Sequence, residues 1–422
     1  MQHTRTISRN YLRAVLALML LVQFAAAQIQ RTPVLMVSID GFRNDYLDRT
    51  DLYDAPNLRA LAKDGVRAEA MIPVFPSKTF PNHYSIVTGL YPAHSGIVGN
   101  RMMDLETREV FSMSNRKAVQ DSKWWQGEPI WVTAEKQGCQ TAPIFWPGSE
   151  AAIEGVRPTH WLPYDESLPN AKRVAMTLNY LSEAVPPCYL SMYMNDVDSA
   201  GHHFGPESQQ TRDAVRSVDG MIGELVAGLK QRGLWGKVNL IIVSDHGMAA
   251  TPASERITLD DYIDLANVDM IDGSPLLALN ARDGNQAALV ASLNRITHLH
   301  AYLAKDVPER WHFSGNKRIA PVVALAEEGW TFETREHMNA WKDPHLGTHG
   351  FDVDLESMRA IFIADGPGFR HGGRLPVFQN INIYSLLTEL LHLKAAPNDG
   401  KLDVFIPVLA EPQSGKTGKT TN

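Results

Sequence analysis

The sequence predicts an α/β fold with a mostly parallel central sheet and helices on both of its faces. Three observations predict it: short continuous apolar segments, amphipathic helical segments between them, and acidic residues directly after several of the apolar segments. Strands that are buried on both faces have continuous apolar sequences rather than alternating ones. Alternation of such strands with helices is typical of a parallel sheet whose two faces are covered.

Four apolar segments are expected to be buried strands, at residues 34–39, 189–194, 238–243 and 360–364. Two segments are expected to be helices. The first, 55–64, follows Asp54 and ends before Gly65. The second, 211–230, has apolar residues at helical spacing and ends near Gly233.

The chain is expected to form one catalytic α/β domain over residues 28–410. This domain includes a less regular insertion at about 251–343, where we find no clear alternation of strands and helices. Residues 411–422 are rich in Gly, Ser, Thr and Lys and are expected to be a disordered tail.

Residues 1–27 have the pattern of a secretory signal peptide. Three arginines and no acidic residue come before an apolar run from Ala14 to Phe24. The small residues Ala25 to Ala27 follow, and cleavage is expected after Ala27. The alternative is a retained membrane anchor, although a membrane span needs about 20 apolar residues. We therefore expect an exported protein, periplasmic or secreted, with no stable membrane span after cleavage.

The charge of the chain argues against a protein that binds nucleic acid polymers. The full chain has a formal charge of −7, and loss of the three arginines of the N-terminal segment changes it to −10. Such an acidic protein is not expected to bind a polymer of nucleotides through a broad basic surface. If its substrate contains phosphate, the protein needs a local positive centre.

The chain has two cysteines, Cys139 and Cys188. They could form a disulfide in an oxidising compartment. Both lie close to apolar segments, so two buried free thiols are an equal alternative. The sequence leaves both states open, and it does not indicate an oligomeric state.

Acidic residues follow three of the predicted strands. Asp40 follows 34–39, Asp198 comes shortly after 189–194, and Asp245 comes shortly after 238–243. In open α/β sheets, ligands bind outside the carboxyl ends of the strands. Carboxylates gathered there repel each other unless cations lie between them. The pattern therefore predicts a metal site at this edge of the sheet.

Two pairs of residues could contribute to such a site. Asp198 and His202 share one face of a helical turn, although this spacing alone is also typical of a solvated helix. Asp245 and His246 are adjacent, so they reach one ion only if the strand ends before them. Gly247 permits the necessary turn. Otherwise Asp245 simply begins a loop.

Three further residues have both a functional and a purely structural interpretation. Thr79 precedes a predicted helix at 84–89, where it is either the N-cap or a nucleophile in the positive potential of the helix N-terminus. Asn100 is typical of a turn. His349 lies within Gly347 to Gly350, which permits close backbone approach. Other histidines are interpreted as surface or packing residues: His83, His203, His298, His300, His312, His337 and His345.

Six segments occur in a recognisable order along the chain. They are Ser38–Arg43, Lys78–His83, Phe145–Glu150, Asp198–His202, Ser244–Met248 and Gly347–Gly350. Together they resemble the catalytic domain of the nucleotide pyrophosphatase/phosphodiesterase family, within the alkaline phosphatase superfamily. The resemblance extends from about Pro33 to Pro407. It implies an alkaline-phosphatase-like fold, a bacterial exported member of the family, and functional roles for the residues above.

By this resemblance the chain would bind two zinc ions, with ligands that are distributed along the chain. One ion would be held by Asp40, Thr79, Asp245 and His246, and the other by Asp198, His202 and His349. His203 lies next to His202, and the spacing from Asp198 favours His202 as the ligand. Carboxylate and imidazole ligands without a thiolate suit zinc, although they do not exclude manganese or cobalt.

The resemblance also implies the roles of the substrate-binding residues. Thr79 would be the nucleophile that forms a phosphoryl-threonine, and its coordination to zinc would activate it. Asn100 would donate hydrogen bonds to the phosphoryl oxygens, as a catalytic and substrate-binding residue. Phe80 and Tyr193 match the positions between which family members stack a nucleobase. Two zinc ions (+4) with three aspartates (−3) leave about +1, which attracts a phosphate to an acidic protein.

The predicted activity is hydrolysis of phosphodiester and pyrophosphate bonds in a nucleotide or other small phosphodiester, with release of nucleoside 5′-monophosphate. A phosphomonoesterase is the first alternative, but some superfamily monoesterases use a Lys-x-Arg pair where this chain has only Arg157 before His160. A choline phospholipid phosphodiesterase is the second, since aromatic residues also bind quaternary ammonium groups. A periplasmic solute-binding protein, from a different class, would not need the ordered metal ligands.

Overall fold

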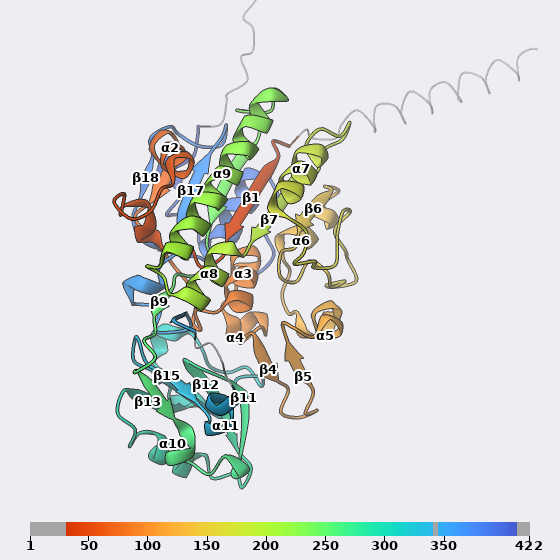
Figure 1. The fold of residues 1–422 in the computed structure, drawn as a ribbon. Coiled ribbons are helices and arrows are strands. Elements are labelled where there is room, and N and C mark those ends of the chain that lie inside the picture. Colours follow the sequence, from red (N-terminus) through yellow and green to blue (C-terminus); the bar gives the residue numbers. More distant parts are fainter. Residues whose placement is uncertain (1–30, 341–344, 412–422) are drawn as a thin grey trace, which may run out of the picture. The chain divides into compact units, whose positions relative to one another are not determined.

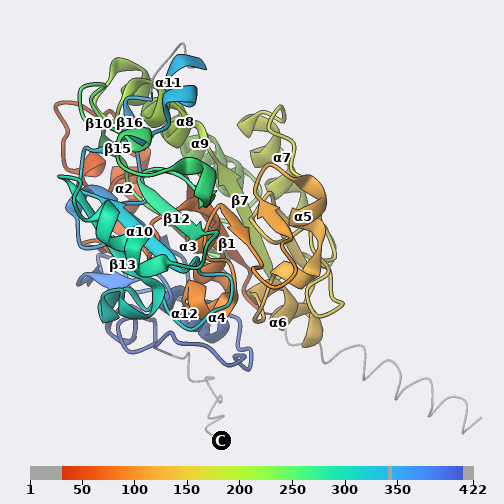
Figure 2. The same cartoon turned by 90° about the horizontal axis from the view of Figure 1, so that it is seen from below.

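The computed structural model describes residues 31–340 and 345–411, which Figures 1 and 2 show from two directions. The signal peptide predicted at residues 1–27 lies outside the described residues, and so does the predicted tail except for Glu411. From Pro33 onward the chain forms one compact unit.

A seven-stranded sheet forms the centre of this unit (Figure 1). Its strands, in spatial order, are β18 (Arg374–Leu375), β2 (Val66–Ala68), β17 (Phe362–Asp365), β8 (Asn239–Val243), β1 (Val34–Ile39), β7 (Tyr189–Met194) and β6 (Thr141–Ile144). The strands β6, β7, β1 and β8 are parallel, and β17 is antiparallel to both of its neighbours. The mostly parallel sheet is therefore confirmed, and all four predicted strands belong to it.

Helices cover both faces of the sheet. One layer consists of α2 (Pro56–Asp64), α7 (Asn170–Tyr180) and α9 (Gln209–Gln231), and the other of α3 (Thr79–Thr88), α6 (Ile130–Lys136) and α12 (Asn382–Leu390). Alternate residues of β1 pack into different layers: Leu35 and Val37 into the first, Val34 and Met36 into the second. Because both layers are apolar, the strand has a continuous apolar sequence. The predicted helices at 55–64 and 211–230 are α2 and α9.

The inserted region is more regular than the sequence indicated. It contains an antiparallel sheet in the order β11 (Val268–Asp272), β12 (Leu276–Ala281), β14 (Val322–Ala326) and β13 (Leu299–Leu303), with α10 (Gln286–Leu293) packed on it. Two short parallel strands, β10 (Arg256–Thr258) and β15 (Thr331–Glu333), lie beside it. The strand β11 has only two buried residues, Val268 and Ile271, and two aspartates interrupt its apolar sequence, so a search for continuous apolar segments does not detect it.

The remaining elements are short. They are the strand pairs β3 (Met71–Ile72) with β19 (Phe378–Gln379), β4 (Arg101–Met103) with β5 (Val110–Ser112), and β9 (Ala249–Ala250) with β16 (Gly347–Thr348), and the helices α4 (Pro92–Ser95), α5 (Arg116–Gln120), α8 (Asp196–Phe204) and α11 (Arg335–Ala340). The pair β9–β16 and the helix α8 position three predicted metal ligands, since α8 contains Asp198 and His202 and β16 ends directly before His349.

A disulfide joins Cys139 and Cys188, with 6.0 Å between the two Cα atoms. Cys139 comes before β6 and Cys188 comes before β7, and these two strands are parallel neighbours. Both residues are buried. The structure therefore has the paired state, of the two that the sequence left open. Disulfides of this kind persist in oxidising compartments.

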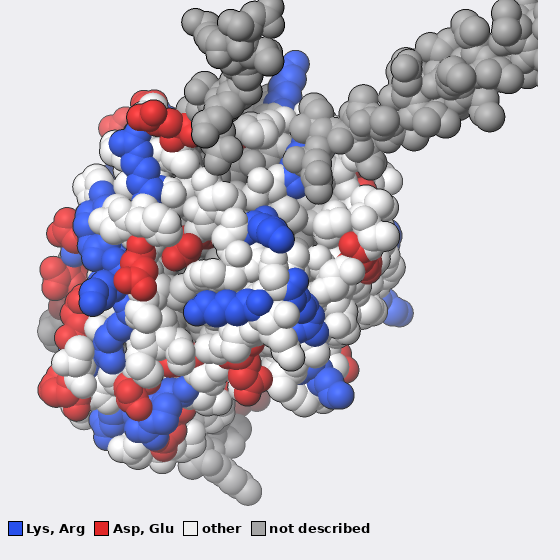
Figure 3. All heavy atoms as spheres, turned by 90° about the horizontal axis from the view of Figure 1, so that it is seen from above, with Lys and Arg blue, Asp and Glu red and all other residues white. Residues whose placement is uncertain are grey.

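The surface in Figure 3 shows acidic and basic side chains interspersed, without one continuous basic area among the residues described on that face. Within residues 31–340 and 345–411, no helix has both the length and the apolar character that a membrane crossing requires.

Candidate active site

The ends of three adjacent strands bring the predicted ligands together. Asp40 directly follows β1, α8 begins two residues after β7 and carries Asp198, and Asp245 comes shortly after β8. Because β7, β1 and β8 are neighbouring parallel strands, their carboxyl ends meet at one edge. Gly41 makes this approach possible, since a Cβ there would lie 2.8 Å from the Cα atom of Asp198.

The first group of possible metal ligands is Asp40, Asp245 and His246, all of them buried. The Nε2 atom of His246 lies 2.9 Å from Oδ2 of Asp245 and 3.4 Å from Oδ1 of Asp40. Asp245 and His246 converge because β8 ends at Val243, as the sequence required. Gly247 is needed for close approach, since a Cβ there would lie 2.0 Å from the carbonyl oxygen of Ser357.

The second group of possible metal ligands is Asp198, His202 and His349. Asp198 and His202 lie one turn apart on α8, with 3.4 Å between Oδ1 and Nε2. His349, just after β16, places its Nε2 atom 3.7 Å from the same Oδ1 atom. The rings of His349 and His246 stack, with 3.5 Å between their centres. The two groups are therefore in direct contact, as a site for two metal ions requires.

Three carboxylate oxygens of the site are buried and accept no hydrogen bond from the described residues: Oδ1 of Asp40, Oδ1 of Asp198 and Oδ2 of Asp245. A buried carboxylate oxygen without a hydrogen-bond donor is costly. Burial, together with the charges of Asp245 and Asp198, raises the pKa of Asp40 well above its usual value. Each aspartate thus offers one oxygen to a cation, and a cation would relieve the repulsion among them.

The three histidines are oriented as metal ligands. In each ring Nδ1 faces a backbone carbonyl: 2.9 Å from Gly347 for His202, 2.9 Å from Gly247 for His246, and 2.8 Å from Ser77 for His349. When Nδ1 donates to that oxygen, Nε2 carries a free electron pair. Metal-binding histidines usually show this arrangement. Burial also lowers the pKa of His349 well below its usual value, which keeps the ring neutral.

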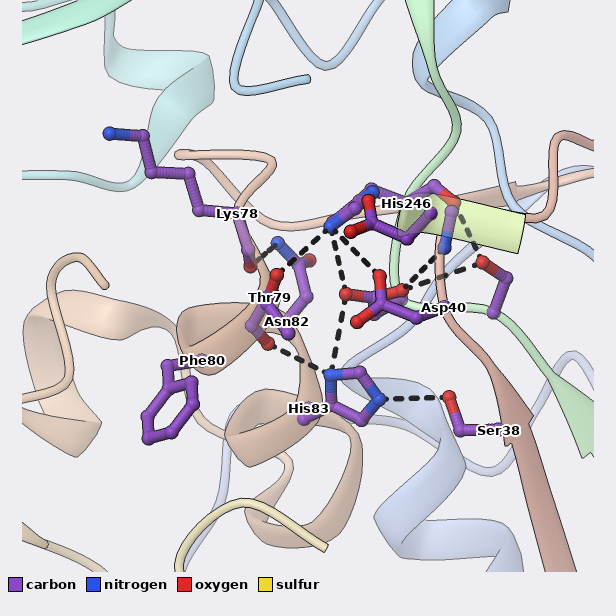
Figure 4. A network of polar contacts seen from close by, with 12 residues as sticks. Ser38, Asp40, Lys78, Thr79, Phe80, Asn82, His83 and His246 are labelled. Carbon is purple, nitrogen blue, oxygen red and sulfur yellow. Dashed lines mark hydrogen bonds and ion pairs between the residues drawn. The ribbon is translucent and has the colours of Figure 1, made fainter. Parts of the chain in front are cut away.

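Thr79 is the first residue of α3, and Lys78 occupies the N-cap position. The interpretation of Thr79 as an N-cap is therefore wrong, because the helix begins five residues earlier than predicted. The Oγ1 atom of Thr79 lies 3.4 Å from Nε2 of His246, beside the first group of ligands (Figure 4). The Thr79 hydroxyl thus lies both at a helix N-terminus and at the candidate metal site.

Asn100 lies beside the start of the same helix. Its Oδ1 atom accepts a hydrogen bond of 2.9 Å from the backbone N–H of Phe80. This contact fixes the orientation of the amide and leaves its NH₂ group as a donor. The arrangement fits the predicted contact of Asn100 with phosphoryl oxygens.

His83 has a more specific place than the surface or packing role that we assigned to it. It is fully buried below the first group of ligands (Figure 4). Its Nδ1 atom lies 2.9 Å from the Thr79 carbonyl and 3.3 Å from Oδ2 of Asp245, and its Nε2 atom lies 2.8 Å from Oγ of Ser38. His83 therefore links the helix α3, the Asp245 carboxylate and β1. Its position directly after Asn82 in the Lys78–His83 segment was the available signal.

A cavity with aromatic walls lies beside Thr79, which is one of its lining residues. Phe80 and Tyr193, the predicted base-stacking residues, both line it, together with Phe145 and Tyr164. The Tyr193 hydroxyl donates a hydrogen bond of 2.5 Å to Oδ2 of Asp40, so this residue also orients a ligand. Burial, together with the charge of Asp40, raises the pKa of Tyr193 well above its usual value, which keeps this donor protonated.

Two of these aromatic residues were not predicted from the sequence. The ring of Phe145 lies 5.4 Å from that of Tyr164, centre to centre. Phe145 has a φ of 63°, in the left-handed region that is costly for a bulky side chain. It belongs to the Phe145–Glu150 segment, which was a signal for this site. Tyr164 lies in a stretch without helix or strand and had no such signal.

Comparison with known proteins identifies the family. Residues 34–352 match the family described as type I phosphodiesterase / nucleotide pyrophosphatase. The chain belongs to this family. The class of enzyme predicted from the six segments, a nucleotide pyrophosphatase/phosphodiesterase, is thereby confirmed.

Two relatives and one solved structure show how far the similarity extends. Venom phosphodiesterase of Naja atra is 39% identical over 381 residues, which are 88% of this chain and 45% of that protein, so the chain spans less than half of it. Bis(5′-adenosyl)-triphosphatase enpp4 of Mus musculus is 40% identical over 374 residues, which are 87% of this chain and 79% of that protein. An inactive variant of murine ectonucleotide pyrophosphatase/phosphodiesterase 5, in complex with AMP, is 36% identical with a TM-score of 0.85, covering 90% of this chain and 100% of that one. This similarity confirms the alkaline-phosphatase-like fold.

The placement of two adjacent histidines in this phosphodiesterase leads to a prediction. His202 contacts Asp198 and faces His349, whereas His203 is exposed and its Nδ1 atom lies 2.8 Å from the Ser199 carbonyl. We expect the His202→Ala variant to bind one metal ion fewer. Its activity should fall by more than the roughly 10–100-fold that is typical when a residue that only contacts a metal ligand is replaced. His203→Ala is the matched control and should keep both. Metal content, by mass spectrometry, and kcat/KM measure the difference between the two variants. A larger loss in His203→Ala than in His202→Ala would show that His203 is the ligand instead.

Proposed function

We propose that this protein hydrolyses phosphodiester and pyrophosphate bonds of nucleotides with two zinc ions, through a phosphoryl-threonine, and releases nucleoside 5′-monophosphate. One observation carries the proposal: the two touching groups of ligands lie beside Thr79, where the aromatic cavity begins. This arrangement combines a site for a phosphoryl group with a site for a flat base.

The residues present fit the two ions. Asp40, Thr79, Asp245 and His246 would hold one ion, and a second set would hold the other. This second set consists of Asp198, His202 and His349. Both sets combine carboxylate oxygen with imidazole nitrogen, as zinc prefers. When bound, the ions supply positive charge that favours the deprotonated Thr79 hydroxyl and the negative charge on the departing oxygen.

The residues of the chain then carry out two displacements. In the first, the Thr79 hydroxyl releases its proton to solvent and its oxygen attacks phosphorus. The bond to the leaving group breaks, and the leaving oxygen takes the electron pair. In the second, water attacks phosphorus, and the Thr79 oxygen departs and regains a proton. The Asn100 amide donates to a phosphoryl oxygen, a contact worth about 3 kcal/mol in a transition state.

The relatives support a nucleotide substrate. The murine protein of the solved structure was captured with AMP, in a variant that is inactive and carries alanine in place of a threonine. The murine relative enpp4 is named for hydrolysis of a dinucleoside triphosphate. AMP and a dinucleoside triphosphate both contain a nucleoside 5′-phosphoryl group. The aromatic cavity that Thr79 lines supports a site for such a group in this chain.

Removal of the Phe80 ring tests the nucleotide preference. Stacking on an aromatic side chain is worth about 1–3 kcal/mol per base, so Phe80→Ala should lower kcat/KM for a nucleoside 5′-phosphate aryl ester by roughly fivefold to a hundredfold. An aryl diester without a base should lose much less. Wild-type protein should prefer both diesters to a simple aryl monoester.

Tyr262→Ala is a matched control, because this aromatic residue is exposed and does not line the aromatic cavity. It should change none of the three rates. Equal losses for both diesters in Phe80→Ala would show that the ring only packs against Phe111 and Trp125. A wild-type preference for the monoester would instead assign the protein to the phosphatases.

A further inference from the structure

Arg173 is a buried arginine of α7 that contacts the aromatic cavity from behind. It does not line the cavity itself, whereas Phe145 and Tyr193 do. Its Nη1 atom donates a hydrogen bond of 2.7 Å to the Tyr193 carbonyl, and its Nε atom donates one of 3.0 Å to the Leu168 carbonyl. Its guanidinium carbon lies 5.0 Å from the centre of the Phe145 ring. One buried cation therefore contacts two residues of the cavity wall.

We propose that Arg173 is a positioning residue that determines specificity: it holds Phe145 and Tyr193 in place and thereby gives the enzyme its preference for substrates that carry a nucleobase. The inference rests on the proposed function, because it assigns that preference to a residue outside the cavity. The two carbonyls that Arg173 binds belong to residues that are not predicted metal ligands. Arg173 can therefore affect the binding of a base without taking part in the displacements.

The end of β6 explains why the Tyr193 carbonyl needs Arg173. The strand β6 ends directly before Phe145, which has a φ of 63° and leaves the sheet. On the other side of β7, the Met194 carbonyl accepts a hydrogen bond from the Asp40 N–H, in the direction of β1. Successive carbonyls of a strand point to opposite sides, so the Tyr193 carbonyl points toward β6, where the strand has already ended. A buried carbonyl needs a donor, and Arg173 supplies the one that β6 does not.

The charge of Arg173 holds the Phe145 ring in its unusual position. A guanidinium over an aromatic ring is attracted to the face of the ring, most strongly where water is excluded. Arg173 and Phe145 are both buried. Both hydrogen bonds described above go to neutral carbonyls, so no carboxylate takes part in them. Because a left-handed backbone is costly for a bulky side chain, this attraction stabilises a conformation that Phe145 alone would not favour.

A displacement of Phe145 would reach the other rings of the wall. The ring centres of Phe145 and Tyr164 are 5.4 Å apart, and those of Tyr164 and Tyr193 are 6.3 Å apart. A flat base gains stacking energy only from rings that lie at a suitable distance. Loss of Arg173 should therefore weaken the contact with a base, whereas the phosphoryl group keeps its contacts with the metal site.

Arg173→Met is the first test, because methionine is also a long unbranched side chain but has no charge and no hydrogen-bond donor. We expect kcat/KM for a nucleoside 5′-phosphate aryl ester to fall by about tenfold, mainly through a higher KM. An aryl diester without a base should lose much less. Lys172→Met is the matched control, since it removes the same charge from an exposed neighbour on the same helix, and it should change neither rate.

Arg173→Lys tests whether the geometry of the guanidinium matters in addition to its charge. A lysine keeps the positive charge but lacks the rigid fork of donors that reaches two carbonyls. Its selective loss should therefore be smaller than that of Arg173→Met. If Arg173→Met does not fold, Arg173→Lys serves the same comparison between the two diesters.

Binding and a double variant give readouts that do not depend on turnover of one substrate. In calorimetry on metal-loaded protein, Arg173→Met should bind AMP about tenfold more weakly and inorganic phosphate as the wild type does. Arg173→Met should also add little to the selective loss caused by Phe145→Leu, because residues in contact have non-additive effects.

Equal losses for both diesters in the Arg173 variants, or an affinity for AMP that neither variant lowers, would overturn the positioning role while the enzyme remains active. Full additivity with Phe145→Leu would also contradict an action through that ring. Absence of turnover of the nucleotide ester by zinc-loaded wild-type protein would instead overturn the proposed function, and this inference with it.

Discussion

Thr79→Ala is expected to lower kcat/KM for every substrate by a factor on the order of 10⁴ or more, as loss of a catalytic nucleophile does. The Thr79 hydroxyl is the one beside His246 and at the start of α3, so in its absence water must attack phosphorus directly. Thr79→Ser should keep a measurable part of the activity, because it retains a hydroxyl at this place. Acid quenching during turnover should trap phosphate on wild-type protein and none on the alanine variant.

Thr88→Ala is a matched control for this experiment. Thr88 is also a buried threonine of α3, but its hydroxyl donates to the Tyr84 carbonyl at the far end of the helix. Its loss should leave the rate close to that of the wild type. Thermal unfolding should show that Thr79→Ala is folded, since the contact of its hydroxyl with Nε2 of His246 is long, at 3.4 Å. An alanine variant with nearly wild-type rates would show that water attacks directly.

Removal of the metal is expected to abolish turnover of every substrate, and zinc is expected to restore it. Three buried carboxylate oxygens accept no hydrogen bond from the described residues. Three imidazole rings direct Nε2 toward the two groups of possible metal ligands that contain these oxygens. Magnesium should restore little activity, because it prefers oxygen ligands and keeps its water. The metal-free protein should also unfold at a lower temperature, since the aspartates then repel each other without a cation.

Activity and melting temperature before chelation, after it, and after zinc addition measure this prediction. The His203→Ala variant serves as a control, since it should respond as the wild type does. Full activity of a metal-free preparation, verified by mass spectrometry, would contradict the two-metal mechanism.

The parts of the molecule that could be predicted are those in which burial or strand direction determines which residue types occur along the chain. The strands β1 and β7 were predicted at their observed bounds, because both faces of the sheet are covered and every residue is apolar or small. The grouping of Asp40 with Asp245 could be predicted because both follow parallel strands of one sheet, whose carboxyl ends meet at the edge where ligands bind.

Other features depend on contacts that the sequence does not show. The helix α3 begins at Thr79, since Pro81 is tolerated in a first helical turn, whereas the predicted helix began only at Tyr84. Tyr164 reaches the aromatic cavity from a stretch without regular structure. The strand β11 was missed because two aspartates interrupt its short apolar sequence.

One face of the inserted sheet packs on a hydrophobic core of its own, whereas Leu276, Val323 and Leu325 on its other face belong to the core that also covers the central sheet. Substitutions that share no contacts usually have additive effects. Changes on the first face, at Leu277 for example, are therefore expected to leave Asp40 and Thr79 in place. The outer part of the insertion can thus diverge among related proteins while the residues at the ends of the central strands keep their positions.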